Sequence, residues 1–420
     1  MKRVISKAGL LVLFSAVVGS AQTAERHSLT DALTIALNNN PEIRAVQKEI
    51  DAAAGRVLQA GYIPNPELFV TYNEVPTNFN LGDAGEKDVG LWQPIEFPGK
   101  RSSRLDVAEH GKSIAEFSLS RTKAIVSAKV KRAYYQSLLA GEVVSNLEFT
   151  ITLLSDFLRT VTERYQAGAS KYLDVIRAKV EVTRLRNDLF EAKREQQTRL
   201  GELNVLLGRT GTTPVVLSDS LTYQPLGILQ DSAVELYANQ SNFLKIVERE
   251  AQRSQSVLNL ARTSYLPDFS LGIAFQKRPG QISPDRSGSS NYLGFQFGVS
   301  VPLWFWQGPK GEVQEAEALL DIGNIRIAAA RLRVRLNILS AFRSASVAQE
   351  QLQVFDTSLL RDVEDELRAG ISAYQNNQVD ALNLFDIYRT FRATKIEYGR
   401  ALYNLLAAKA ELEVAGETAE

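Results

Sequence analysis

The sequence predicts a mainly α-helical protein with a small β part, in which one order of helices and strands occurs twice. Three observations support this fold class. Long segments carry apolar residues at heptad spacing, and two pairs of shorter segments alternate apolar with small or polar residues. The two halves of the chain also match at a steady offset of roughly 200 residues, which indicates an internal duplication.

The composition excludes several classes of protein. The chain has 420 residues with 48 basic and 48 acidic side chains, a balance that argues against a nucleic-acid partner. Because cysteine is absent, there is no disulfide and no lipid-modified N-terminal Cys. His27 and His110 lie far apart in sequence, so we interpret them as non-ligands and expect no metal site and no cofactor. Phosphate-loop and hydrolase motifs are missing, and we do not expect an enzyme.

The first residues have the pattern of a secretory signal. Lys2, Arg3 and Lys7 precede an apolar run over 8–18, and Gly19-Ser20-Ala21 offers small residues for cleavage. We therefore expect residues 1–21 to be a signal peptide and the mature chain to be exported. Further along, no continuous apolar run of about 20 residues predicts a membrane-spanning helix.

The first structural repeat is predicted over 22–225. It begins with a helix that Asn38-Asn39-Asn40-Pro41 interrupts and that ends at Tyr62-Ile63-Pro64-Asn65. A β-hairpin over 67–97 follows, and then a long helical hairpin over 100–208.

The second structural repeat is predicted over 226–420, with the same order of elements. Its first helix is interrupted near Gln240-Ser241-Asn242 and ends at Tyr265-Leu266-Pro267-Asp268. The β-hairpin is expected over 268–303 and the long helical hairpin over 310–414. Gly308-Pro309-Lys310-Gly311 occupies the place that Pro98-Gly99-Lys100-Arg101 has in the first repeat.

The helices after each hairpin carry coiled-coil seams. In the first repeat the seam residues are spaced alternately by three and four: Val144, Leu147, Ile151, Leu154, Leu158, Val161 and Tyr165. A single helix over 101–164 would be about 100 Å long at 1.5 Å per residue. An elongated soluble coiled coil would explain these helices, but it would not explain strands inserted at the same place in both repeats.

The strands have one apolar face and one small or polar face. A soluble sandwich would have the same alternation, but the length of the run over 291–303 and its small polar residues favour lipid around the apolar face. The residues predicted to face lipid are Leu293, Phe295, Phe297, Val299, Val301, Phe269, Leu271 and Ile273. Trp92, Trp304 and Trp306 lie at or near strand ends, where aromatic belts meet headgroups; packing in a protein core is the alternative.

Four strands per chain cannot close a sheet. An open edge in hydrocarbon leaves backbone groups unpaired at several kcal/mol each, so several chains must share one barrel. Two chains would give eight strands and a filled interior, and three would give twelve strands with a lumen. The small residues Gly272, Gly294, Gly298 and Ser300 suit a hollow interior. We therefore predict a homotrimer with a twelve-stranded barrel.

With the repeat in place, the chain resembles the TolC family of outer-membrane efflux ducts over essentially its whole mature length. Three stretches carry the resemblance: Leu29-Thr30-Asp31-Ala32-Leu33 with the Asn-rich break, Gln93-Pro94-Ile95-Glu96-Phe97-Pro98-Gly99-Lys100-Arg101, and Arg164-Tyr165-Gln166-Ala167-Gly168 with Leu173-Asp174-Val175. The second stretch looks most like the CzcC and CusC branch, which serves heavy-metal pumps of the resistance-nodulation-division (RND) class.

The resemblance implies a fold, partners and a location. It implies a trimeric α-helical periplasmic barrel continued by an outer-membrane β-barrel of a Gram-negative-type cell. It also implies a periplasmic membrane-fusion adaptor and an inner-membrane RND-type pump that meet the duct at two helical tips. The candidate adaptor-contacting residues are Tyr165, Gly168, Ser170, Asp174, Tyr374 and Asn377.

The candidate periplasmic gate consists of Asp386 and Asn383. Three copies of Asp386 around a three-fold axis would form a carboxylate ring that favours cations. The alternative is that Asp386 pairs with Arg389 on its own helix. The expected function is a passive outer-membrane exit duct, with heavy-metal cations as the cargo that the branch implies. The alternative is an elongated periplasmic coiled-coil or adaptor protein without a pore.

Overall fold

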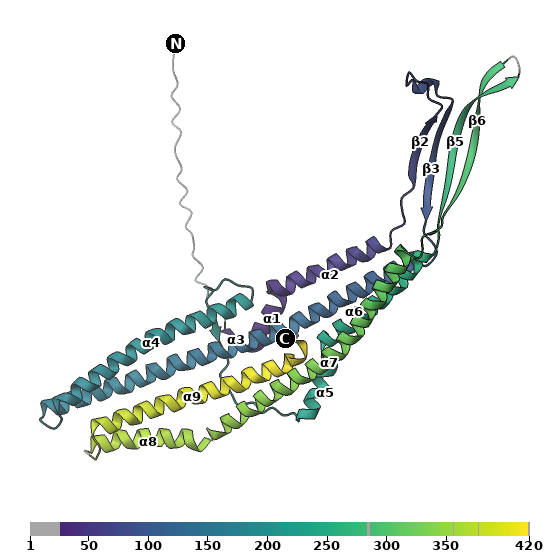
Figure 1. The fold of residues 1–420 in the computed structure, drawn as a ribbon. Coiled ribbons are helices and arrows are strands. Elements are labelled where there is room, and N and C mark those ends of the chain that lie inside the picture. Colours follow the sequence, from purple (N-terminus) through teal and green to yellow (C-terminus); the bar gives the residue numbers. More distant parts are fainter. Residues whose placement is uncertain (1–25, 284–285, 356, 377, 419–420) are drawn as a thin grey trace, which may run out of the picture.

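The computed structural model describes residues 26–283, 286–355, 357–376 and 378–418. The predicted signal peptide, residues 1–21, lies outside the described residues. The chain forms a long layer of helices with a four-stranded sheet at one end and two helical turns at the other (Figure 1). One described helix, α3 (Lys100–Gln166), is long and apolar enough by composition to cross a membrane, with a mean hydropathy of 1.3 over 18 residues, whereas no such helix was expected from the sequence. It packs against α2 (Pro41–Ala60), α4 (Tyr172–Leu206), α6 (Asn242–Arg262) and α9 (Ala381–Val414).

Each half of the chain contributes two short helices, a β-hairpin and a long helical hairpin, in that order. The first half contains β1 (Arg26–His27), α1 (Leu29–Asn39), α2 (Pro41–Ala60), β2 (Glu67–Asn73), η1 (Leu81–Asp83), β3 (Glu86–Ile95), α3 (Lys100–Gln166), α4 (Tyr172–Leu206) and β4 (Val216–Leu217). The second contains α5 (Gln230–Gln240), α6 (Asn242–Arg262), η2 (Thr263–Tyr265), β5 (Asp268–Ser283), β6 (Arg286–Ser300), α7 (Gly308–Val354), α8 (Thr357–Gln375), α9 (Ala381–Val414) and η3 (Ala415–Glu417). The exact limits of the two repeats stay a prediction.

Three element boundaries differ from those expected. The two strands of the second hairpin extend further than the apolar alternation, because antiparallel pairing continues from Lys277↔Asn291 to Ser283↔Arg286, where apolar residues no longer alternate. Strand β6 ends at Ser300, before Pro302, which has no N–H to donate. The second long helix is divided into α7 and α8, whereas α3 runs unbroken for 67 residues, about 100 Å.

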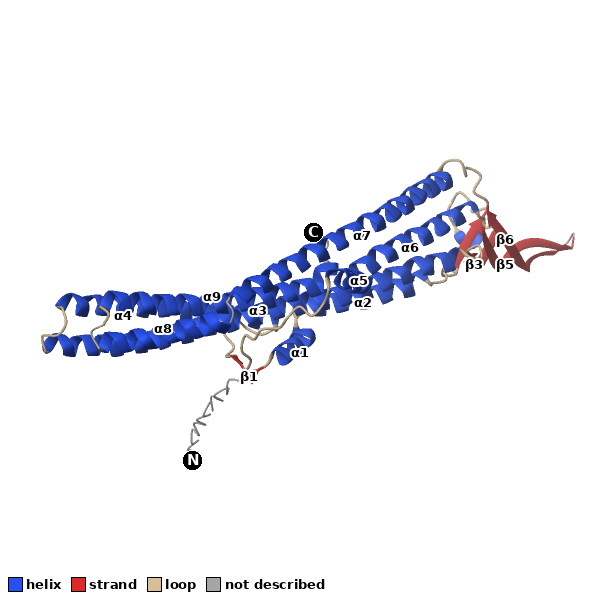
Figure 2. Cartoon of the chain, turned by 90° about the horizontal axis from the view of Figure 1, so that it is seen from below, coloured by secondary structure: helices blue, strands red, loops and turns tan. Residues whose placement is uncertain are grey.

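From one edge of the molecule to the other, the helices follow the same order as the strands to which they connect. Near the sheet, neighbouring helices follow the order α2, α3, α6, α7, and the strands above them follow the order β2, β3, β5, β6. Towards the other end, α4 and α9 flank α3, and α8 packs on α9 (Figures 1 and 2). The layer is therefore four elements wide along its length, with α2 and α4 on one edge and α7 and α8 on the other.

Helix breaks near the middle let separate helices stack end to end. The Asn40 side chain caps α2 and donates from Nδ2 to the Leu206 carbonyl at the end of α4, 2.8 Å away. In the second half, the buried Glu417 carboxylate accepts from the backbone N–H groups of Asn242 and Phe243 at the start of α6, at 3.0 and 3.1 Å. Both devices satisfy N–H groups that a helix start leaves unpaired.

The heptad seam is buried as predicted over most of its length. Val144, Leu147, Leu154 and Val161 are buried, whereas Tyr165 at the tip is exposed. Across the layer, Phe157 packs edge-on against Phe385 with ring centroids 5.4 Å apart. The apolar core near the two helical turns therefore joins α3 of the first half to α9 of the second.

Candidate functional site

The sheet presents an apolar face that no other described part of the chain covers. In register along this face, Leu271 pairs with Phe297, Ile273 with Phe295 and Phe269 with Val299. Of the predicted lipid-facing residues, Leu293, Phe295, Phe297, Val299, Leu271 and Ile273 are exposed on this face, with Phe295 77% exposed. Phe269 is half-buried between the rings of Phe97 and Phe297, at 6.1 and 6.2 Å. Val301 is exposed but lies beyond the end of the strand.

The opposite face of the sheet carries large side chains as well as the small ones that the sequence predicted. Trp92 pairs with Gly272, so its indole lies on the polar face and not on the apolar one. A Cβ on Gly272 would come within 2.6 Å of the Trp92 ring, and one on Gly298 within 3.2 Å. Phe69 covers Gly90 in the same way. The expectation that Trp92 joins an aromatic belt was therefore wrong, because strand register and not nearness to a strand end decides the face.

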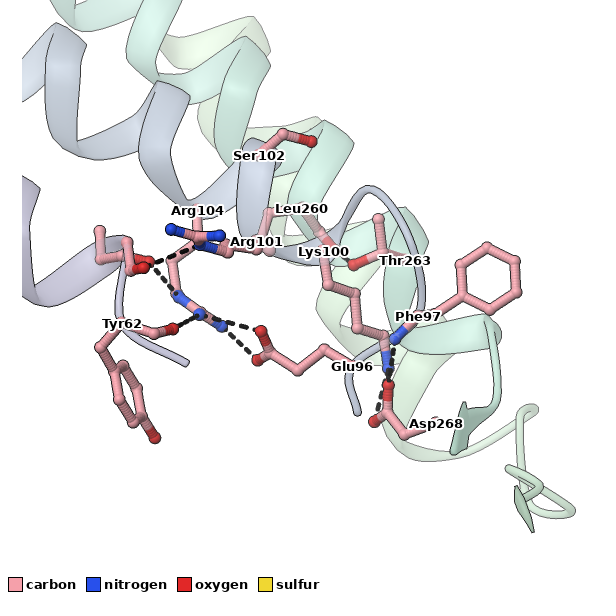
Figure 3. Close-up of polar contacts among 12 residues, drawn as sticks. Tyr62, Glu96, Phe97, Lys100, Arg101, Ser102, Arg104, Leu260, Thr263 and Asp268 are labelled. Atoms are coloured by element: carbon pink, nitrogen blue, oxygen red, sulfur yellow. Dashed lines mark hydrogen bonds and ion pairs between the residues drawn. The ribbon is translucent and has the colours of Figure 1, made fainter. Parts of the chain in front are cut away.

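Basic residues at the start of α3 hold the sheet on the helical layer. Lys100 Nζ lies 2.8 Å from both carboxylate oxygens of Asp268, the first residue of β5 (Figure 3). It also donates to the Leu266 carbonyl at 3.2 Å. The same Asp268 accepts from the Phe97 backbone N–H at 2.9 Å. This ion pair therefore joins the start of α3 to the strand contributed by the other repeat.

Two arginines complete the junction. Arg104 is bidentate to Glu96 at the end of β3 and donates from Nε to the Ala60 carbonyl at 2.9 Å (Figure 3). Arg101 donates to the Gly61 carbonyl at 2.7 Å, so both arginines bind the carbonyl end of α2, where a helix carries partial negative charge. Gly99 enters α3 with φ of +105°, which a side chain would strain. From the sequence, this motif indicated only a family resemblance and not its function as a joint.

At the far end, the two helical tips lie side by side (Figure 1). The first turn ends α3 with Gly168 at φ of +74° and a hydrogen bond from Ala169 N to the Arg164 carbonyl at 2.8 Å. Tyr165 is exposed and its ring lies 5.3 Å from that of Tyr172, while Ser170 and Asp174 are half-buried. The left-handed glycine closes the turn, as expected for a helix C-terminus.

The second turn is held to the first by Arg164. Its Nη1 donates to the Tyr374 carbonyl at 3.0 Å, and its guanidinium lies 5.1 Å over the Tyr374 ring. Tyr374 is buried, with its ring edge-on to that of Phe157 at 4.8 Å between centroids. Its side chain is therefore covered by its own chain and is not available for contact with an adaptor. Asn377 lies outside the described residues. The roles of the tip residues stay predictions, and Arg164 is a contact that sequence reasoning missed.

The candidate gate residues lie on the first turns of α9. Asn383 is exposed, and its backbone N–H is capped by the Asp380 carboxylate at 2.9 Å. The exposed Asp386 is 3.6 Å from Arg389, the pairing that we had named as the alternative to a gate ring. The ring itself stays a prediction. Close by, burial raises the pKa of Tyr388 to about 12, so its hydroxyl stays neutral beside Asp156.

Three basic residues on α9 form ion pairs with acidic residues on the neighbouring helices α4 and α8. Arg389 is 3.3 Å from Glu181 of α4, Arg392 is 3.7 Å from Asp188 of α4, and Lys395 is 2.6 Å from Glu364 of α8. Glu181 is almost fully buried, with 11% of its side chain exposed, so Arg389 neutralises a carboxylate that water reaches poorly.

Among the described residues, no group of three or more His, Asp or Glu side chains could hold a metal ion. His27 is buried beside Arg209, with Nε2 3.1 Å from Nη1, whereas His110 lies on α3. The described residues therefore form three candidate functional regions: the exposed apolar face of the sheet, the ion-paired junction at the start of α3, and the two helical tips.

Comparisons with known proteins agree with this arrangement. A family model described as Outer membrane efflux protein matches residues 32–209. The cobalt-zinc-cadmium resistance protein CzcC of Cupriavidus metallidurans is 24% identical over 374 residues, covering 88% of this chain and 85% of the relative. The nickel-cobalt-cadmium resistance protein NccC of Alcaligenes xylosoxydans xylosoxydans is 24% identical over 343 residues, covering 80% and 73%.

Among solved structures, that of CusC matches with a TM-score of 0.73 at 16% identity, covering 92% of this chain and 91% of the other. At this identity the likeness concerns the fold. The predicted fold class, mainly helical with a small sheet and the architecture of these channels, is confirmed.

The Trp92 packing leads to a first prediction. Gly272→Ala should lower the free energy of unfolding by about 1–3 kcal/mol, because the new Cβ overlaps the indole. Gly294→Ala is the matched control, since the nearest atom to its Cβ would be at an ordinary 3.5 Å. Denaturant unfolding in detergent measures both. Adding Trp92→Ala should remove most of the penalty at Gly272, and equal penalties at the two glycines would contradict the packing.

The tip contacts lead to a second prediction. Arg389→Ala should lower the free energy of local opening at the α9 start by about 2 kcal/mol, because the Glu181 carboxylate loses a charged hydrogen-bond partner. Hydrogen exchange of peptides from 378–391 measures the change. Arg400→Ala, which removes an exposed arginine from the same helix, is the control. Exchange that is no faster in Arg389→Ala than in the control would show that the contact does not hold the tip.

Proposed function

We propose that the chain is an outer membrane efflux protein and the exit duct of a tripartite efflux system for heavy-metal cations; the family model over residues 32–209 and the two metal-resistance relatives at 24% identity support this. Members of this family are channel proteins, and they form trimers that work with an adaptor and an RND pump. We propose the same assembly for this chain, with the sheet in the outer membrane and the helices in the periplasm.

The observation that carries the proposal is the distribution of exposed apolar side chains over the helical layer. Most of them lie on its two edges, whereas the central helices α3, α6 and α9 carry only three among the described side chains: Phe149, Tyr165 and Leu382. On the α2 and α4 edge they are Leu58, Tyr172, Leu173, Ile176, Val180, Phe190 and Val205. On the α7 and α8 edge they are Leu319, Ile322, Ile325, Leu332, Leu336, Val347, Val354 and Leu359. Apolar edges on both sides favour association side by side.

The sheet has the same two edges. Strand β2 lies above α2 and β6 above α7, and each of these strands has one side without a partner strand among the described residues. Because each unpaired backbone group in lipid costs several kcal/mol, we propose that β6 of one copy pairs with β2 of the next. The two edges differ, so the contact is heterologous, and we propose a rotation between copies that closes it into a ring. Three copies give twelve strands and leave room for a lumen.

The cargo proposal rests on the two metal-resistance relatives. CzcC and NccC are named for resistance to cobalt, zinc, nickel and cadmium. This chain has no Cys and only one Met, at position 1, so it offers few of the soft ligands that would trap such ions. A duct that binds its cargo weakly suits rapid passage. We propose that the pump selects the metal and supplies the energy, and that the tips at Tyr165–Asp174 and Tyr374–Asp386 meet the adaptor.

The proposed assembly leads to a third prediction. Leu332→Arg combined with Leu336→Arg should abolish the trimer, because two charges would be buried against the next copy. Asn259→Arg, on exposed surface of the central helix α6, should leave the trimer intact. Multi-angle light scattering in detergent distinguishes the two results. A trimer that survives both arginines on α7 would overturn the proposed contact.

A further inference from the structure

A half-open cavity lies between the middle of α3 and the helical tips, and the proposed function does not use it. Its volume of about 1000 Å³ is at the upper end of the range that small-molecule sites occupy, roughly 300–1,000 Å³. Both repeats form its walls: α3 and α4 from the first, α8 and α9 from the second, and a segment around β4 on one side (Figure 1). A molecule bound there would contact both halves of the chain.

Most of the cavity wall is apolar. The α3 residues that line it recur alternately after three and four positions, so one face of the helix forms the wall: Leu139, Glu142, Asn146, Phe149 and Leu153. The other helices contribute Leu200 of α4, Ile371 of α8 and Ile396 of α9. A wall of this kind binds the apolar part of a ligand, and its few polar groups decide which ligand fits.

The charged residues of the cavity leave one carboxylate without a cation. Glu364 of α8 is 2.6 Å from Lys395 and 3.7 Å from Arg368. Asp219 accepts from the Tyr134 hydroxyl at 2.9 Å. Among the residues that the structure describes, Glu142 has no Lys, Arg or His as an ion-pair partner. The excess negative charge of the cavity therefore lies at Glu142.

Glu142 and its neighbour Asn146 both present acceptor atoms that lack a donor. The Glu142 carboxylate lies against α9 where Gly399 leaves room, since a Cβ there would be 3.1 Å from Glu142 Oε2. Although the side chain is partly exposed, burial among the helices raises the pKa of its carboxyl, and a hydrogen bond from the Leu221 backbone offsets only part of this. One turn along α3, the buried Asn146 Oδ1 has no hydrogen-bond partner within the described part of the chain.

We propose that this cavity binds an amphiphilic amine, a molecule with an apolar body and one primary ammonium group. The ammonium donates to the Glu142 carboxylate and to Asn146 Oδ1, and so supplies both the positive charge and the donor that these groups lack. The apolar body packs against Phe149 and Leu153. Because the cavity lies within the helical layer, this inference rests neither on the location of the sheet nor on the cargo of the duct.

Dansylcadaverine is a suitable probe, because it joins an apolar fluorophore to one primary ammonium group and its emission rises in apolar surroundings. The N-pentyl analogue, which has the same fluorophore and chain but no amine, is the matched control ligand. The full chain in detergent is titrated with each probe, and protein-free micelles give the blank.

The amine should bind saturably, and its N-pentyl analogue should bind at least about tenfold more weakly, because only the amine can form the charged hydrogen bonds. Glu142→Gln should bring the affinity for the amine down to that for the analogue. Glu116→Gln, an exposed glutamate on the same helix outside the cavity, should change neither affinity. Leu200→Trp, which fills part of the cavity, should abolish saturable binding of both probes.

The affinity for the amine should also fall as the pH is lowered from neutrality, beginning above the pH at which an ordinary glutamate titrates, because protonation of Glu142 removes the charge that binds the ammonium. The other charged groups that face the cavity, Asp219, Glu364, Arg368 and Lys395, remain in Glu142→Gln, and this variant should show no such fall. Equal affinity for the two probes, unchanged binding in Glu142→Gln, or the absence of saturable binding would each overturn the proposal.

Discussion

The structure depends on one constraint: a layer four elements wide with two edges that the chain cannot cover by itself. In the sheet, β2 and β6 each have a side without a partner strand, and backbone groups there need partners in any apolar medium. In the helical part, the same two sides carry most of the exposed apolar residues. Because both parts of the molecule are open at the same sides, one side-by-side contact between copies would satisfy both.

The open sides of the sheet and of the helical layer coincide only if strands and helices keep the same order. Ion pairs at the start of α3 hold the sheet and the helical layer together. Lys100 binds Asp268 of β5, and Arg104 binds Glu96 of β3 together with the end of α2. The charges are only partly exposed, so these ion pairs are stronger than surface pairs. They connect both repeats within one turn of helix, at the level where the chain passes from helices to strands.

Much of the fold could be predicted, because the features that specify it are local in sequence. Heptad spacing predicted the buried positions from Val144 to Val161, and the Asn-rich stretch predicted the interruption between α1 and α2. Alternation predicted which residues of β5 and β6 share a face. What could not be predicted depends on register and on contacts across the layer. Trp92 lies on the polar face because it pairs with Gly272, and Tyr374 is buried because Phe157 and Arg164 from the other repeat cover it. No local pattern encodes either contact.

The most direct test of the central claim is disulfide scanning between β2 and β6 in this Cys-free chain. Pairs of cysteines, one on each strand, cannot bridge within a chain, because two strands separate them by about 14 Å and a disulfide needs Cα atoms within about 7 Å. Oxidation of the membrane-embedded protein should give covalent dimers and trimers at pairs in one consistent register, and no larger species. Monomers at every pair would contradict the closure of this layer by copies of itself.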